Sequence, residues 1–127
     1  ENENWEEARN YIDLYLSEDD GHSWQYLDRP VQDTGVGGNP PTMTKLRDGR
    51  LCITYGYRDT PYSILAKISD DNGITWSTEI VIRDDGGSHD IGYPRTIQRT
   101  DGSIVTVYYF ADKPDGPRYI ASTIWRA

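Results

Sequence analysis

The chain has 127 residues, enough for one domain with a hydrophobic core, and its 13 basic and 21 acidic residues give a formal net charge of −8. This acidic balance argues against nucleic acid as a partner, because few cationic side chains are present to neutralise phosphates. No apolar run approaches the roughly 18 residues that cross a membrane, and the single cysteine, Cys52, excludes an internal disulfide.

Alternating apolar residues predict β-strands along most of the chain, and no segment carries a sustained helical period. Residues 1–10 form an acidic lead-in. The expected strands cover residues 11–16, 24–29, 42–46, 51–57, 62–68, 76–82, 96–99, 104–110 and 118–125. Segments 30–41 and 84–92 are rich in Gly, Pro and polar residues, so we expect both to be connections outside any sheet.

Two turns between these strands share the pattern Ser-x-Asp-x-Gly-x-(Ser/Thr)-Trp. The residues are Ser17, Asp19, Gly21 and Trp24 in the first turn, and Ser69, Asp71, Gly73 and Trp76 in the second. In each turn the serine and aspartate can accept hydrogen bonds from nearby backbone N–H groups. The glycine can adopt a positive φ, and the tryptophan can anchor the returning strand. We therefore expect a tight reversal at both positions.

Other segments repeat at a similar spacing. Residues 38–42 are echoed by 92–96, the Asp-Gly turn at 48–49 by that at 101–102, and residues 51–55 by 104–108. A period of about 50 residues is typical of propellers and solenoids. We predict an all-β chain with the last two strands of one unit at 11–37, a complete four-stranded unit at 38–91 and three strands of a further unit at 92–127.

The two turns match the Asp-box, or BNR, motif, and from about residue 11 the chain resembles the C-terminal blades of a bacterial sialidase-like glycoside hydrolase. The resemblance implies a six-bladed β-propeller, of which this chain would form a segment of about two and a quarter blades. In that family the Asp-boxes lie away from the active site, and propellers without enzymatic activity carry them too. The resemblance also implies a secreted or periplasmic protein, although the chain carries no signal peptide.

Sialidases use a tyrosine nucleophile with an assisting glutamate, an aspartate acid/base and three arginines that hold the substrate carboxylate. The resemblance places such a site around Asn39 and Tyr93, where the innermost strand of each blade begins. Tyr93 falls at the position of the nucleophile; the alternative is a tyrosine packed around the central channel. A phenol avoids repulsion by an anionic sugar, but its free pKa of about 10 means that it needs a nearby base.

Four further residues are candidates for this site. Arg95 and Arg58 would contact an anionic group, because guanidinium groups bind carboxylates bidentately. Alternatively, Arg95 points outward between blades and Arg58 pairs with Asp59. His89 and Asp90 form a possible acid/base pair, with Asp90 as the catalytic group, and His89 and Asn39 would contact substrate.

We expect neither a metal nor another cofactor. The two histidines lie far apart without a cysteine or carboxylate pattern, and the acidic residues of the Asp-boxes lack the spacing of a calcium loop. The arginine motif and the general acid that sialidases carry toward the N-terminus are missing, and no glutamate is assignable to the assisting role. The catalytic set within the chain is therefore incomplete.

Two functions fit the sequence. The first is the C-terminal part of a sialidase-like hydrolase acting on terminal acidic or neutral sugars of glycans. The second is a non-catalytic carbohydrate-binding or structural propeller module that closes a ring by oligomerising, for instance as a trimer. The chain begins without methionine, so the remaining blades could also belong to a longer parent chain. An arginine cluster with a carboxylate beside Tyr93 would favour the hydrolase, whereas a site lined only by aromatics and amides would favour the binding module.

Overall fold

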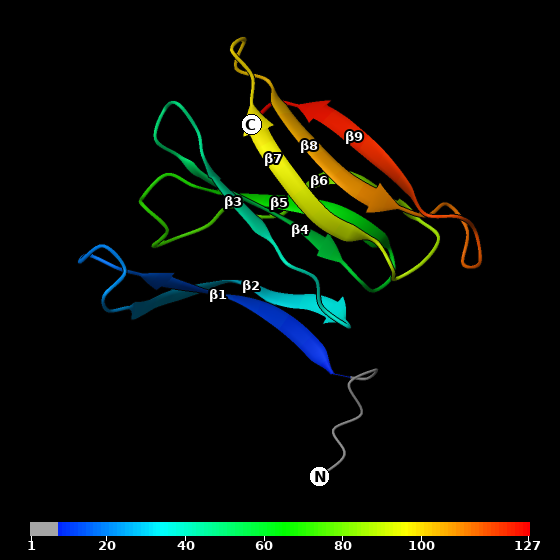
Figure 1. Ribbon diagram of the computed structural model, residues 1–127, viewed down its shortest axis with the longest axis horizontal. Coiled ribbons are helices and arrows are strands. Elements are labelled where there is room, and N and C mark those ends of the chain that lie inside the picture. The colour runs from blue at the N-terminus through cyan, green and yellow to red at the C-terminus, as the bar shows by residue number, and fades with distance from the viewer. Residues whose placement is uncertain (1–7) are drawn as a thin grey trace.

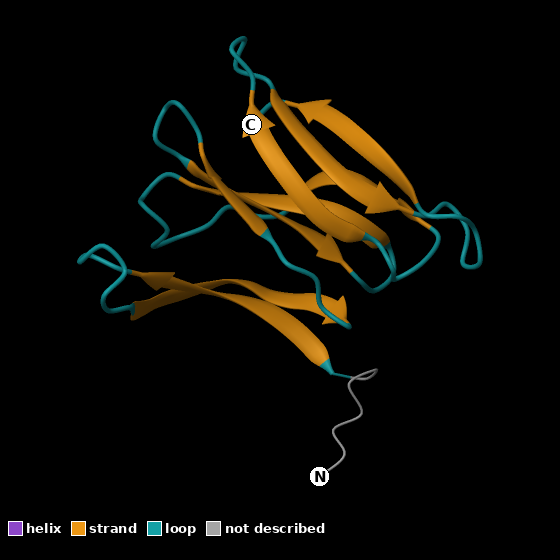
Figure 2. Ribbon diagram, in the orientation of Figure 1, coloured by secondary structure: helices purple, strands orange, loops and turns teal. Residues whose placement is uncertain are grey.

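The computed structural model describes residues 8–127, which form nine β-strands and no helix (Figures 1 and 2). The strands are β1 (Arg9–Leu16), β2 (Gln25–Val36), β3 (Thr42–Lys45), β4 (Leu51–Tyr57), β5 (Tyr62–Ser69), β6 (Ile80–Gly86), β7 (Gly92–Gln98), β8 (Ile104–Phe110) and β9 (Tyr119–Trp125). They form three antiparallel sheets of two, four and three strands, each in chain order. The predicted all-β class is confirmed.

The three sheets are layered, with the four-stranded sheet in the middle (Figure 1). Its strand β4 contacts β2 of the first sheet and β7 of the third. Five consecutive residues of β4 are buried, because both of its faces are covered. In β8 buried and more exposed residues alternate, because only one face of the third sheet is covered by the residues that the structure describes. Among the described residues, the first sheet and the third sheet therefore each have one uncovered face.

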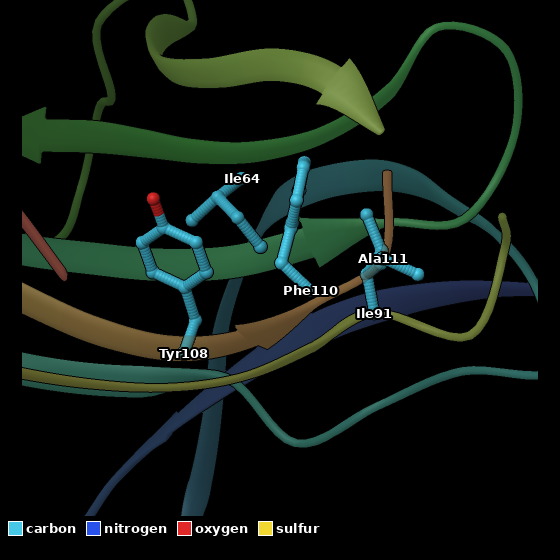
Figure 3. Packing of buried hydrophobic residues seen from close by; sticks show 5 residues of the cluster. All are labelled: Ile64, Ile91, Tyr108, Phe110 and Ala111. Carbon is cyan, nitrogen blue, oxygen red and sulfur yellow. The ribbon is translucent and has the colours of Figure 1, made fainter. Parts of the chain in front are cut away.

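Separate apolar clusters fill the two interfaces. Between the first and second sheets lie Val31, Ile53, Tyr55 and Leu65. Between the second and third sheets lie Leu46, Cys52, Ala66 and Ile104, together with a second group formed by Ile64, Ile91, Tyr108, Phe110 and Ala111 (Figure 3). Each cluster joins residues that are distant in sequence, so the sheets depend on one another for burial.

Buried threonines also connect the second and third sheets. The Thr54 and Thr96 hydroxyls lie 2.8 Å apart, and the Thr96 and Thr106 hydroxyls lie 3.0 Å apart. The indole N–H of Trp125 donates to Thr106 over 3.0 Å. Because each buried hydroxyl has a partner, the hydrogen bonds offset the cost of desolvation and help to set how the two sheets align.

The prediction that residues 30–41 form a connection is wrong for residues 30–36. Strand β2 continues through them to Val36 and pairs with β1 along an interrupted register, from Ile12 opposite Val31 to Leu14 opposite Asp28. The extra residues opposite β1 form a bulge that contains Pro30. A proline is tolerated there because β2 is an edge strand and a bulge needs one fewer ladder hydrogen bond.

Other strand boundaries also differ from the expectation. Strand β1 begins at Arg9, inside the expected lead-in, whose residues 1–7 lie outside the described part of the chain. Strand β6 extends to Gly86, and β7 begins at Gly92, so both enter the expected 84–92 connection. The polar residues of β6 can be accommodated because this strand lies at the edge of its sheet, where side chains and backbone remain hydrated.

The two Asp-boxes form similar turns but have different surroundings. The serine hydroxyl accepts a 2.8 Å hydrogen bond from the glycine N–H in each box, Gly21 to Ser17 and Gly73 to Ser69. Trp76 packs against the cluster between the first and second sheets. Trp24, in contrast, is 63% exposed, because no described sheet lies on its side of the first sheet.

Candidate functional site

The two ends of the sheets differ in character. Both Asp-boxes and both Asp-Gly turns lie at one end, which we call the Asp-box end; the boxes are at the left of Figure 1. The opposite end, which we call the site end, collects the ends of β4 and β8, the starts of β3, β7 and β9, and the loops of residues 87–91 and 111–118. Functional side chains gather on loops held by a rigid scaffold, so the site end is the natural place to look for chemistry.

The loop before β7 positions Asp90. Ile91 is fully buried in the cluster of Figure 3 and anchors the loop in the core. The backbone N–H of Asp90 donates to the Ser88 hydroxyl over 3.2 Å. With these two neighbours held, the Asp90 carboxyl is fixed at the site end while its side chain remains 48% exposed.

Asp90 makes a hydrogen bond with the end of β8 and an ion pair with the residue before β9. The Tyr109 hydroxyl at the end of β8 donates to Asp90 Oδ1 over 2.5 Å. The Arg118 Nε, just before β9, lies 3.2 Å from Asp90 Oδ2. Arg118 also donates from Nη2 to the Ser88 hydroxyl and from Nη1 to the Gly116 carbonyl, each over 2.9 Å. Asp90 therefore links the end of β8 to the segment that leads into β9.

This arrangement moves the pKa values of Asp90 and Tyr109 further from neutral pH. The hydrogen bond from Tyr109, with the nearby Arg118 and Arg58 charges, holds the pKa of Asp90 below its usual range. Burial and the hydrogen bond to Asp90 raise the pKa of Tyr109 to about 12. At neutral pH the proton therefore stays on Tyr109, and Asp90 remains an ionised acceptor.

Arg58 lies beneath this pair and is only 9% exposed. Its Nε donates to the Ile91 carbonyl over 3.0 Å, and its Nη1 donates to the carbonyls of Gly37 and Gly38. Its Nη2 donates to the Tyr109 hydroxyl over 2.8 Å. We expected Arg58 to contact an anionic ligand or to pair with Asp59, but it instead joins three segments of the site end. A buried guanidinium needs such partners because its desolvation is costly.

The Asn39 side chain, like that of Arg58, bonds to backbone groups of distant segments. Its Oδ1 accepts hydrogen bonds from the backbone N–H groups of Gly56 and Tyr93, and its Nδ2 donates to the Gly56 carbonyl over 3.1 Å. A Cβ atom at Gly92, where φ is +125°, would lie 2.3 Å from Asn39 Oδ1. Glycine is therefore required at Gly92. The Asn39 amide joins two sheets, and the residue also lines a hollow of about 450 Å³ between β1 and the start of β3.

Tyr93 is 51% exposed and has a φ of +50°, which is uncommon for a bulky residue. Its ring lies 5.7 Å from the Tyr109 ring between centroids, and the Arg58 Cζ is 5.9 Å from the ring centre. Strain of this kind is concentrated at functional sites. The structure does bring Tyr93 close to an arginine and a tyrosine, although the carboxylate at this place bonds to Tyr109.

A hollow of about 370 Å³ opens beside the pair and is lined by Asp90, Tyr109, Arg118, Tyr119 and Ile120. The Tyr119 hydroxyl is held by Asp112 and Arg83, so its ring forms a fixed wall. Ile120, 73% exposed, supplies an apolar edge. Aromatic and apolar walls with a few convergent polar groups are typical of small-ligand sites.

Another hollow, of about 480 Å³, lies at the Asp-box end and is lined by residues that include Arg50, Asp70, Trp76 and Ala127. It is the larger of the two. Its surroundings, however, are turn residues whose hydrogen bonds close the Asp-box itself, such as Thr75 to Asp71 over 2.8 Å. We therefore assign the candidate site to the smaller hollow, where charged groups from separate strands converge.

The remaining predicted residues are more peripheral. His89 is exposed on the loop, and its carbonyl accepts the Ile91 N–H over 2.9 Å. Arg95 is exposed on the open face of β7, and its Nη1 donates to the Pro94 carbonyl. The outward alternative that we considered for Arg95 matches this position.

Sequence reasoning did not single out Tyr109 and Arg118. A signal for Tyr109 was present, because the period-two alternation in β8 places it on the face opposite the buried Tyr108. Arg118 carried no comparable signal, since its role depends on Ser88 and Asp90 in a distant loop.

Residues 8–127 contain no group of three or more His, Cys, Asp or Glu side chains arranged to hold a metal ion. In the same part of the chain no helix is long and apolar enough to cross a membrane.

A scan against protein-family models and a search of curated proteins found no match. Among solved structures the chain is similar to a protein of unknown function from Dyadobacter fermentans DSM 18053, with a TM-score of 0.69 and 34% sequence identity. The similarity covers 88% of this chain and 30% of that protein. The chain therefore spans less than a third of the length of the protein that it matches.

Proposed function

We propose that this chain is a segment of a sialidase-like β-propeller protein and that its site end binds a sugar of a glycan. The observation that carries the binding function is the Asp90 carboxylate, ionised, half-exposed and held by Tyr109 and Arg118 at the wall of a hollow. Sugar hydroxyls donate well to such a carboxylate, and tyrosine rings pack well against the apolar faces of sugars.

The propeller architecture is supported by the internal repeat. Strands β4 and β8 each follow an Asp-Gly turn, so they occupy equivalent places in their sheets. Cys52 and Thr54 of β4 are fully buried by the third sheet. On the equivalent face of the third sheet, Ile97, Val107 and Ile124 are exposed, and so is Ile120 at the edge of the hollow. In a propeller a further blade would cover this face and would also border the hollow.

Further blades of a longer chain fit better than copies of this one. The first sheet contains two strands and the third contains three. If one copy completed the sheet of the next, five strands would combine where the central sheet has four. The threefold greater length of the similar protein, about a third of which is matched, also favours a longer polypeptide. A trimer is therefore the weaker alternative.

Glycoside hydrolysis is the second candidate. The Arg58 and Arg118 guanidinium groups around the Asp90 carboxylate, near Tyr93, are the arrangement that we expected of the hydrolase. The backbone strain at Tyr93 also favours it, because strained exposed residues are common in active sites. Against it, the pKa of Asp90 is lowered and the pKa of Tyr109 is raised, whereas proton transfer at neutral pH requires pKa values near 7. Among the described residues no carboxylate is bonded to the Tyr93 hydroxyl. Binding is thus the better supported function of this chain.

A glycan array probed with the full chain tests the proposal. We expect retention of one or more glycans, and loss of that retention in Asp90→Asn. Tyr26→Phe, on the open face of the first sheet, is the matched control and should bind as the unchanged protein does. Failure of the unchanged protein to retain any glycan would refute the binding function.

Turnover is measured separately with chromogenic aryl glycosides. If the chain is a hydrolase, hydrolysis should be detectable and Tyr93→Phe should abolish it. Circular dichroism of this variant should show an unchanged fold. Binding without hydrolysis would leave the non-catalytic function as the correct one.

A further inference from the structure

We propose that Asn72 in the second Asp-box is a deamidation site and that Ser69 protects it for as long as the box is closed. This inference does not depend on the proposed glycan binding. An asparagine followed by glycine is especially prone to deamidation, because glycine has no side chain that hinders attack by its backbone nitrogen. Asn72 precedes Gly73, and no other asparagine of the chain precedes a glycine.

Deamidation at this place is a reaction of the chain with itself, followed by hydrolysis. The Gly73 nitrogen loses its proton and attacks Cγ of Asn72. A bond from this nitrogen to Cγ forms, the bond from Cγ to Nδ2 breaks, and ammonia leaves with the proton. Water then opens the cyclic imide at one of its two carbonyls, which gives aspartate or isoaspartate. Water is the only co-reactant that the sequence of steps requires.

The Asp-box binds the nitrogen that would attack. The Gly73 N–H donates to the Ser69 Oγ over 2.8 Å, and Ser69 is 1% exposed. The Ser69 hydroxyl donates its own proton to Asp71 Oδ1 over 2.8 Å, so the lone pairs of the serine oxygen are left for backbone N–H groups. A buried, hydrogen-bonded amide loses its proton slowly, because exchange requires the bond to open. The reactive form of the Gly73 nitrogen is therefore rare in the closed box.

The first sheet restricts the space around the same glycine. A Cβ atom at Gly73 would lie 2.9 Å from Leu14 Cδ2 and 3.4 Å from Leu27 Cδ2. Asn72, in contrast, is exposed and has a φ of +60°. Ring closure requires the backbone between the two residues to rotate, and the leucine side chains leave little room for this rotation.

The first Asp-box provides an internal comparison. Gly21 donates to Ser17 over 2.8 Å, as Gly73 does to Ser69, but Gly21 is exposed. The residue before this glycine is Asp20, whose φ of +57° matches that of Asn72. A carboxylate is a poorer electrophile than an amide, so this turn reacts slowly even when it is open. The reactive asparagine thus lies in the box whose glycine is covered.

Reaction at Asn72 would disrupt the turn. Isoaspartate adds a methylene group to the main chain, which would displace Gly73 from Ser69. The 3.1 Å hydrogen bond from the Trp76 indole N–H to the Gly73 carbonyl would be disturbed as well. The new carboxylate would also lie next to Asp71 in sequence and repel it. Since Trp76 packs against the cluster between the first and second sheets, this damage would reach the core.

Peptide mapping tests the proposal on the full chain. After incubation at mildly alkaline pH, trypsin releases residues 68–83, in which Asn72 is the sole asparagine. Mass spectrometry with electron-transfer fragmentation then quantifies aspartate and isoaspartate. A synthetic peptide of the same residues gives the unprotected rate. We expect the folded chain to react far more slowly than this peptide.

Ser69→Ala should accelerate the reaction about tenfold, as the loss of one hydrogen bond would produce. The rate of each variant is divided by that of its own peptide, which removes the effect of the changed sequence. Thr106→Val is the matched control. It removes a buried hydroxyl that accepts from Trp125 over 3.0 Å, so it lowers stability at a place away from the box. Its deamidation rate should equal that of the unchanged protein.

Hydrogen exchange of the Gly73 amide, followed by NMR in the unchanged protein, decides the question even if Ser69→Ala does not fold. We expect this amide to exchange slowly. Rapid exchange, or deamidation of the folded chain at the rate of the peptide, would overturn the proposal. Equal acceleration by Ser69→Ala and Thr106→Val would also overturn it, because the reaction would then pass through global unfolding.

Discussion

The Tyr109 hydroxyl donates to Asp90 over 2.5 Å, and this bond joins the end of β8 to the loop before β7. We expect Tyr109 to titrate at about 12, above the roughly 10 of a free phenol, because burial and the Asp90 charge disfavour the phenolate. Phenolate absorbance, compared between the unchanged protein and Tyr109→Phe, measures this value. In Asp90→Asn the pKa should fall but stay above 10, since burial, the larger cause, remains.

The same pair predicts how stability depends on pH. The contribution of Tyr109 is fully present below about pH 10 and is lost as the pH rises through about 12. The contribution of Asp90 is present above about pH 4 and is lost as the pH falls through its lowered folded-state value. A stability profile unchanged by Asp90→Asn at both extremes would contradict the pairing.

The buried guanidinium of Arg58 is expected to be essential for folding. Arg58→Met leaves the acceptors of three segments without their donor, so it should lower the free energy of unfolding by about 3–5 kcal/mol. Urea unfolding followed by fluorescence measures the change. Arg95→Met is the matched control and should alter stability by less than about 0.5 kcal/mol, because Arg95 is exposed. Equal stability of the two variants would show that Arg58 is not a structural clamp.

The two Asp-box tryptophans should differ in energetic importance. Trp76 packs against the cluster between the first and second sheets and donates its indole N–H to the Gly73 carbonyl over 3.1 Å. Trp76→Ala should therefore cost about 3 kcal/mol. Trp24→Ala should cost less than about 1 kcal/mol in this chain, because Trp24 is 63% exposed. Similar losses would indicate that a further sheet covers Trp24 in solution.

The stability that the second Asp-box confers should decrease in acid. Hydrogen bonds from Thr75, and from Ser69, lower the pKa of Asp71 to about 2. The stability that it confers is full above about pH 4 and is lost as the pH falls through about 2. Asp71→Asn should unfold at lower urea concentration at pH 7, with a smaller difference from the unchanged protein near pH 2. A difference that stays constant over this range would assign the effect to shape instead of charge.

The candidate site could be anticipated only in part. Tyr93 and Asp90 were expected near one another, and both lie at the site end, because the loop of residues 87–91 leads directly into β7. Arg58 and Asn39 were expected to contact a ligand, but their side chains bond to carbonyls and backbone N–H groups of distant segments, and Arg58 is buried by them. No local pattern reveals such bonds, since their partners lie far away in sequence.

By itself the sequence determined the all-β class and the positions of the turns. Strand periodicity and turn residues act over a few neighbouring positions, so they can be interpreted without the rest of the chain. Only the tertiary structure decided which face of each strand is covered, how the bulge carries β2 past Pro30, and which arginine is buried. Above all, it decided that Asp90 bonds to Tyr109, because that contact forms only when the third sheet packs against the second and the loop between them closes.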